Sequence, residues 1–136
     1  MEINLFVYGT LRRGFPNPYQ RLLDEHGTYL GRARFQGRLF EVEDYPGALP
    51  SADPADHVIG DLYRIDHADE VMAALDLYEE CTPAFPQPWE YIRREIQVSL
   101  ADGQDLPAWT YLYNRRSDNL ETIPSGDYLR FNRSRR

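Results

Sequence analysis

Short segments rich in β-forming residues follow one another along this chain and constrain its fold more than any other feature. We expect five or six strands, with the clearest at residues 3–8, 28–42, 58–65, 90–100 and 106–114. The last two predict a hairpin around residues 101–105. Because the strands do not alternate regularly with helices, as they would in a parallel sheet, the pattern favours an α+β fold with a mainly antiparallel, barrel-like sheet.

Two segments predict helices of unequal quality. The better one runs from Ala68 to about Glu80, with Asp66 as its expected N-cap. Its apolar residues recur at helical spacing, and they are Val71, Met72, Leu75 and Tyr78. The poorer helix is expected from Tyr19 to His26, where Gly27 would end it.

Glycine and proline indicate where the expected strands bend. Gly31 and Gly37 lie inside segment 28–42, which we therefore expect to be a bent strand or a pair of strands. Glycines in such positions are typical of β-bulges and of close backbone approach. Pro46 and Gly47 favour a turn over residues 44–48.

The charged residues exclude several classes of function. The 136 residues carry a net charge of −7, which argues against a nucleic-acid partner. All 15 basic residues are Arg, so a Schiff-base lysine, a P-loop lysine and a Ser–Lys dyad are excluded. We expect residues 1–128 to form one domain. Residues 129–136, which contain Arg130, Arg133, Arg135 and Arg136, are expected to form a solvated, partly disordered basic tail. The alternative is that these arginines bind phosphate.

Cysteine content and hydropathy indicate the compartment. Cys81 is the only cysteine, so no internal disulfide can form, as expected in a reducing compartment. No apolar run approaches the roughly 18 residues that a transmembrane helix needs. The N-terminal residues lack the basic and cleavage features of a signal peptide. We therefore expect a cytoplasmic protein without a membrane partner.

Glu79 is the strongest catalytic candidate. At about 100° per residue along a helix, Glu79 falls on the apolar face between Leu75 and Met72, whereas Glu80 is turned away. Burial disfavours the charged form of a carboxyl, so its pKa should rise toward neutrality, where a general base works best. The alternative interpretation is a frayed helix end that leaves Glu79 in solvent.

A second candidate is the exit from the first expected strand, residues 8–12. A strand that ends in Gly9 and enters an irregular loop exposes successive backbone N–H groups, which can bind an anion or an oxyanion. An ordinary strand exit is the alternative. Tyr91, Tyr111 and Tyr113 lie on expected strands, where tyrosines line pockets or, more commonly, pack in the core.

Other reactive side chains give weaker signals. The histidines show no metal-ligand spacing, and no HExxH or paired CxxC motif occurs. Cys81 lies close to Glu79 without an obvious histidine partner nearby. A small hydrolase or transferase that uses Cys81 as its nucleophile is therefore one remaining hypothesis.

The separate signals match one family in order. The chain resembles the γ-glutamylcyclotransferase-like (AIG2-like) proteins over about residues 3–128, and within them the γ-glutamylamine cyclotransferase branch most. The motifs that carry the resemblance are residues 6–14 (FVYGTLRRG), 45–48 (YPGA), 75–79 (LDLYE), 91–94 (YIRR), 108–113 (AWTYLY) and 123–128 (IPSGDY).

The resemblance implies a compact β-barrel packed with helices, without a metal or an organic cofactor. It implies an enzyme that cyclises a γ-glutamyl amine or γ-glutamyl amino acid to 5-oxoproline, with Glu79 as general base. The implied substrate-binding residues are Tyr8, Gly9, Thr10, Leu11, Tyr91, Tyr111 and Tyr113. The protein would act as a monomer or a weak homodimer. The alternative is a non-catalytic module that binds a small ligand on the same fold.

Overall fold

A computed structural model describes residues 2–13, 17–43 and 45–134. Five strands form a closed barrel in the order β1-β5-β2-β6-β7. Their bounds are β1 Ile3–Val7, β2 Gly27–Phe35, β5 Val58–Ile65, β6 Tyr91–Leu100 and β7 Asp105–Tyr113. All neighbours pair antiparallel except β1 and β7, which pair in parallel and close the barrel. The predicted α+β fold with a mainly antiparallel barrel is confirmed.

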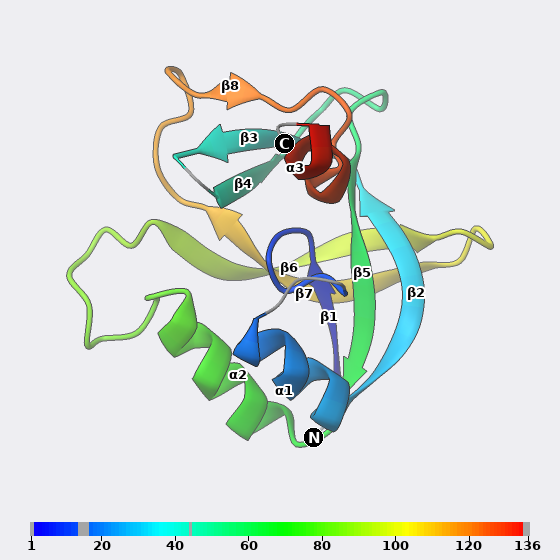
Figure 1. The fold of residues 1–136 in the computed structure, drawn as a ribbon, viewed down its shortest axis with the longest axis vertical. Helices are drawn as coiled ribbons and strands as arrows, with labels where there is room; N and C mark the ends of the chain where they lie inside the picture. Colours follow the sequence, from blue (N-terminus) through cyan, green and yellow to red (C-terminus); the bar gives the residue numbers. More distant parts are fainter. Residues whose placement is uncertain (1, 14–16, 44, 135–136) are drawn as a thin grey trace.

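A second sheet and three helices complete the fold. The sheet has the order β4-β3-β8, and its strands are β3 Gly37–Val42, β4 Tyr45–Pro50 and β8 Glu121–Thr122. The helices are α1 Pro18–His26, α2 Ala68–Tyr78 and α3 Tyr128–Ser134. Figure 1 shows α1 and α2 together at one end of the barrel, and the small sheet with α3 at the other. No helix of the described segments is long and apolar enough to cross a membrane.

Strand β1 connects the two parts of the core. Because successive side chains point to opposite faces, Leu5 and Val7 join one hydrophobic cluster while Phe6 and Tyr8 join the other. The first cluster includes the buried stripe of α2, namely Val71, Met72 and Leu75. The second reaches the small sheet and α3 through Leu39, Ala48 and Tyr128. The residues that follow β1 are therefore held between both packing layers.

The expected hairpin and bulge are confirmed. Strands β6 and β7 pair from Tyr91↔Tyr113 to Ser99↔Asp105. Segment 28–42 is a pair of strands, β2 and β3, that belong to different sheets. The β2–β5 register shifts between Tyr29 and Gly31, where Gly31 has φ 133°. A residue with a Cβ rarely adopts that φ, which explains the glycine at the bulge.

The turn predicted over residues 44–48 is wrong. Residues Tyr45–Pro50 form β4, which pairs with β3 from Gly37↔Pro50 to Val42↔Tyr45, while Asp44 lies outside the described residues. A Cβ built on Gly47 would lie 3.0 Å from Tyr113 Cβ, so glycine serves close packing here and not a turn. Tertiary pairing has overridden the local turn signal.

Two predictions at helix ends also fail. The N-cap of α2 is His67, with φ 52° and no side-chain cap bond, and not Asp66. Residues 128–134 form α3, with Tyr128 buried and Phe131 packed on the core, where we expected a solvated tail from residue 129. The predicted tail residues Arg135 and Arg136 lie outside the described residues.

Candidate active site

A cavity of about 530 Å³ lies where the end of β1 meets the C-terminal end of α2 and strands β6 and β7. Seven of the predicted site residues line it, namely Tyr8, Gly9, Thr10, Leu11, Glu79, Tyr91 and Tyr111. Its size is typical of a site for a small molecule. Residues from distant parts of the sequence thus come together around one carboxyl group.

The end of α2 places Glu79 at this cavity. Glu79 is the C-cap of the helix, with φ −83° and its N–H donating to Leu75 O at 2.8 Å. It is half-buried, whereas Glu80 has φ 59° and is exposed. The two neighbouring carboxyls therefore differ in exposure as predicted. The cause at Glu80 is a backbone turn in the left-handed region and not a position on a continuing helix.

The Glu79 carboxyl is surrounded by conditions that favour its neutral form. Among the described residues, no group donates a hydrogen bond to its oxygens. Burial raises the pKa of Glu79 to about 7, and the nearby carboxyls of Glu90, Asp76 and Glu80 contribute to the same shift. A carboxyl of this kind can take up and release a proton near neutral pH.

The loop after β1 provides backbone donors in the same cavity. The amide N–H groups of Gly9, Thr10 and Leu11 have no acceptor among the described residues, and all three residues line the cavity. A Cβ on Gly9 would lie 2.9 Å from Pro46 Cγ, so a larger residue would displace the loop. Free amides of this kind can hold an anionic oxygen.

Three of the predicted tyrosines form part of the cavity wall. Their hydroxyls already donate hydrogen bonds to protein groups and are therefore not free to donate to a substrate. Tyr8 OH donates to Tyr111 O at 2.5 Å, and Tyr91 OH donates to Pro46 O at 2.7 Å. Tyr111 OH donates to Asp76 Oδ1 at 2.7 Å. Burial raises the pKa of all three hydroxyls, so they stay neutral and keep these bonds.

Tyr113 is the one predicted site residue that is absent from the cavity lining, and its ring packs against Tyr91 at a centroid distance of 5.8 Å. It shares a strand face with Tyr111, but β4 covers that end of the strand at Gly47. The cavity therefore gives no support to Tyr113 as a substrate-binding residue, and strand alternation cannot show which part of a face another strand covers.

Several lining residues were not anticipated from the sequence. Tyr78 OH shares a hydrogen bond with Thr10 Oγ1 at 3.0 Å, and Tyr45 OH donates to Glu90 Oε1 at 2.8 Å. Further lining residues come from segment 82–90 and from the chain just after β7, namely Phe85, Pro86, Trp89, Glu90 and Arg115. Aromatic residues within a proline-rich segment were the one sequence signal that could have pointed to this wall.

Cys81 lacks the properties of a nucleophile. It is half-buried and does not line the cavity, and its Sγ lies 3.9 Å from Asp76 Oδ1. Burial, with Asp76 and Glu79 nearby, raises the pKa of the thiol to about 12. The thiolate, which is the reactive form, is therefore disfavoured, and the hypothesis of a Cys81 nucleophile is not supported. Within the described residues, no group of three His, Cys, Asp or Glu could hold a metal ion.

One cavity on a small barrel is lined both by a carboxyl whose pKa is raised to about 7 and by residues with free backbone donors. Such a combination is typical of a site for a small-molecule enzyme. Comparisons with known proteins identify the family. The sequence model described as gamma-glutamyl cyclotransferase, AIG2-like, matches residues 5–130. The chain belongs to this family and is an enzyme of it.

Individual relatives agree with this assignment. The chain is 33% identical over 128 residues to the gamma-glutamylcyclotransferase family protein YtfP of Escherichia coli K12, covering 93% of this chain and 96% of that protein. It is 35% identical over 120 residues to gamma-L-glutamyl-butirosin B gamma-glutamyl cyclotransferase of Niallia circulans, covering 88% and 71%. The crystal structure of an AIG2-like protein from Mus musculus matches with a TM-score of 0.70 at 24% identity, covering 93% and 94%.

Proposed function

We propose that the protein cyclises a γ-glutamyl amine or a γ-glutamyl amino acid to 5-oxoproline and releases the free amine. The α-amino nitrogen of the glutamyl group attacks its own γ-carbonyl carbon, and the bond from that carbon to the leaving nitrogen breaks. The α-ammonium nitrogen loses two protons on its way to the lactam N–H, and both end on the leaving nitrogen, which departs as an ammonium, so neither water nor a second substrate is consumed. Membership of the family supports this class of reaction.

The observation that carries the proposal is the Glu79 carboxyl in a cavity shared with the free amides of the loop after β1. The attacking nitrogen must first lose a proton, and an α-ammonium group has a pKa of about 8. With a pKa of about 7, Glu79 has a similar basicity and can both accept this proton and pass it to the leaving amine. General base catalysis of this kind contributes about 10²–10⁴-fold to rate.

The amides of Gly9, Thr10 and Leu11 take the second role. They would hold the substrate α-carboxylate or the oxyanion that forms when the γ-carbonyl is attacked. The loss of one such donor typically lowers turnover by about 10²–10³-fold. Nucleophile and electrophile belong to one substrate, so the main task of the cavity is to fold that substrate into a reactive shape.

A screen of γ-glutamyl amines and dipeptides, with 5-oxoproline as the product measured, tests the proposed reaction. One relative is named for γ-L-glutamyl-butirosin B, so this compound is included in the screen beside simple amines and amino acids. We expect release of 5-oxoproline and amine in equal amounts. A ligand that binds in the cavity and is released unchanged would instead support the non-catalytic binding module.

Glu79→Gln tests the role of the carboxyl. Glutamine keeps the size of the side chain but cannot accept the proton, so kcat should fall by about 10²–10⁴-fold with the fold intact. Glu80→Gln is the matched control, because it removes the exposed neighbouring charge and should change kcat only slightly. Equal activity in the two variants would remove Glu79 from the mechanism.

A further inference from the structure

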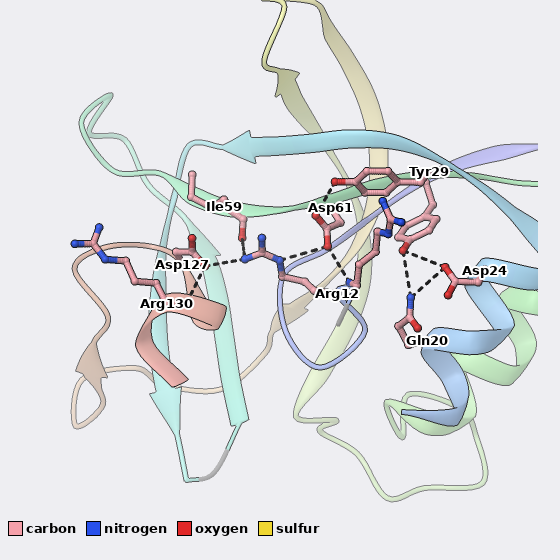
Figure 2. Close-up of polar contacts among 10 residues, drawn as sticks. Arg12, Gln20, Asp24, Tyr29, Ile59, Asp61, Asp127 and Arg130 are labelled. Carbon is pink, nitrogen blue, oxygen red and sulfur yellow. Dashed lines mark hydrogen bonds and ion pairs between the residues drawn. The ribbon is translucent and has the colours of Figure 1, made fainter. Parts of the chain in front are cut away.

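Arg12, in the loop after β1, is a buried cation. Its side chain is 1% exposed and does not line the cavity. Figure 2 shows the guanidinium between Asp61 and Asp127. A buried charge is costly without partners, and a planar guanidinium can bind several acceptors at once.

Arg12 joins three segments that are distant in sequence. Its Nε donates to Asp61 Oδ2 at 3.5 Å, and its Nη1 donates to Asp127 Oδ1 at 2.8 Å and to Ile59 O at 3.5 Å (Figure 2). Asp61 and Ile59 lie on β5, while Asp127 directly precedes α3. One side chain therefore connects the loop to the barrel and to the C-terminal segment.

The backbone of the loop is bonded at the same place. Arg12 N–H donates to Gly9 O at 3.1 Å, and Arg13 N–H donates to Asp61 Oδ2 at 3.0 Å. These bonds fix the chain immediately after Gly9, Thr10 and Leu11, whose amides face the proposed oxyanion. A shift of Arg12 would therefore move those amides.

The C-terminal segment offers Arg12 a fixed acceptor. Ile59 N–H donates to Gly126 O at 2.7 Å. Gly126 has φ 67°, and a Cβ there would lie 1.8 Å from His57 O, so the chain passes against β5 as only glycine allows. Asp127 follows directly, and its Oδ1 also accepts from Arg130 N at 3.2 Å. The carboxyl that binds Arg12 is thus held from both sides.

We propose that the C-terminal segment positions the active-site loop from outside the cavity, with Asp127 and Asp61 holding Arg12 as a positioning residue. This inference rests on the proposed function, because the loop matters only if its amides serve the reaction. A misplacement of about 1 Å can lower turnover by about 10²-fold. Losing one of the partners of Arg12 should have a smaller effect, of about tenfold, on kcat.

Three substitutions at Asp127 separate this role from the capping of α3. Asp127→Ser retains an N-cap oxygen but is too short to reach Arg12. Asp127→Ala has neither contact, and Asp127→Asn can keep both. Asp118→Asn is the control, because it removes another carboxylate that pairs with an arginine, Arg116, away from the loop.

Amide hydrogen exchange reports the position of the loop without depending on activity. In Asp127→Ser we expect the bonded amides of Arg12 and Arg13 to exchange about tenfold faster, while the Arg130 amide stays protected. Asp127→Ala should lose protection at both places, and Asp127→Asn should lose little at either. Wild-type exchange of the Arg12 and Arg13 amides in Asp127→Ser would overturn the proposal.

Turnover completes the test. We expect kcat to fall about tenfold in Asp127→Ser and Asp127→Ala at temperatures where both are folded, and to stay near wild type in Asp127→Asn and Asp118→Asn. Faster loop exchange with unchanged kcat would overturn the catalytic importance of the positioning. If the wild-type protein forms no 5-oxoproline, the proposed function fails by itself, and exchange still decides whether Asp127 holds the loop.

Discussion

Two walls of the same cavity are held in place in different ways. The loop after β1, residues 8–13, is fixed by long-range bonds, with Arg12 reaching Asp61 and Asp127, which are 49 and 115 residues away. On another wall, the bonds of segment 82–87 stay local within the described residues. Phe85 N–H donates to Thr82 O, and Trp89 Nε1 donates to Phe85 O.

We infer from this difference that the two walls have different roles in the reaction. Catalytic donors must stay within a narrow range of positions, and the loop after β1 has the contacts to achieve this. The wall that carries Phe85 and Trp89 presents aromatic surface and has fewer long-range bonds, namely those that Asn114 Nδ2 and Arg115 Nη2 donate to Trp89 O and Pro88 O. We infer that this wall contacts the leaving amine, whose identity can vary without disturbing the reacting atoms.

Among the substitutions that alter one wall of the cavity, Gly9→Ala should have the largest effect, because it displaces the loop after β1. The added Cβ would lie 2.9 Å from Pro46 Cγ, so the loop has to move away from buried β4. We expect kcat/KM to fall by about 10²-fold for every substrate. Gly103→Ala is a destabilising control in the β6–β7 turn, with φ 90° and no neighbour near the added atom. An equal loss in both variants would show that stability, and not loop position, controls activity.

Trp89→Ala tests the proposed role of the aromatic wall, because it changes that wall and leaves the loop after β1 unchanged. Removing the indole should change the ratio of kcat/KM between a bulky and a small γ-glutamyl amine by about tenfold. The smallest substrate should be cyclised at nearly the wild-type kcat. Trp109, which stacks with Arg93 and does not line the cavity, provides the matched control Trp109→Ala. A uniform loss for all substrates would contradict the division between the walls.

Glu90→Gln should produce the smallest effect, a displacement of the pH profile. Activity requires the Glu79 carboxylate, so kcat/KM should rise with pH through about 7. Removing the Glu90 charge relieves repulsion, which lowers the pKa of Glu79 and moves the rise to lower pH by less than about one unit. Glu80→Gln should move it less, because Glu80 raises the pKa of Glu79 less than Glu90 does. A rise unmoved in Glu90→Gln would contradict this electrostatic account.

The parts of the cavity that could be predicted from the sequence are Glu79 and the strand exit at Gly9, because both follow from local patterns. The helical spacing of Val71, Met72 and Leu75 placed Glu79 on the buried face of α2, and the structure agrees even though α2 ends at Tyr78. Gly9 at the end of a hydrophobic run indicated the strand exit. These features depend on residues that are close in sequence, so periodicity and turn chemistry are sufficient to find them.

What could not be predicted depends on contacts between distant residues. No local pattern indicates that Arg12 is buried, because Asp61 and Asp127 meet it only after the barrel has closed. Strand alternation predicted that Tyr113 shares a face with Tyr111 and lines the same site. In the structure β4 covers Tyr113, and this could not be foreseen because the residues of β4 have the composition of a turn. A single sequence gives no information on either of these pairings.

The pKa of Glu79 is the most direct test of the central claim. Nuclear magnetic resonance of the carboxyl carbon, with Glu79→Gln used to assign the signal, measures it without substrate. We predict a titration midpoint near 7, at the pH where kcat/KM rises, because the carboxyl is buried among other carboxyls. A midpoint near the ordinary value of 4.5 would contradict the claim, since a carboxyl so acidic would be in solvent and a poor base.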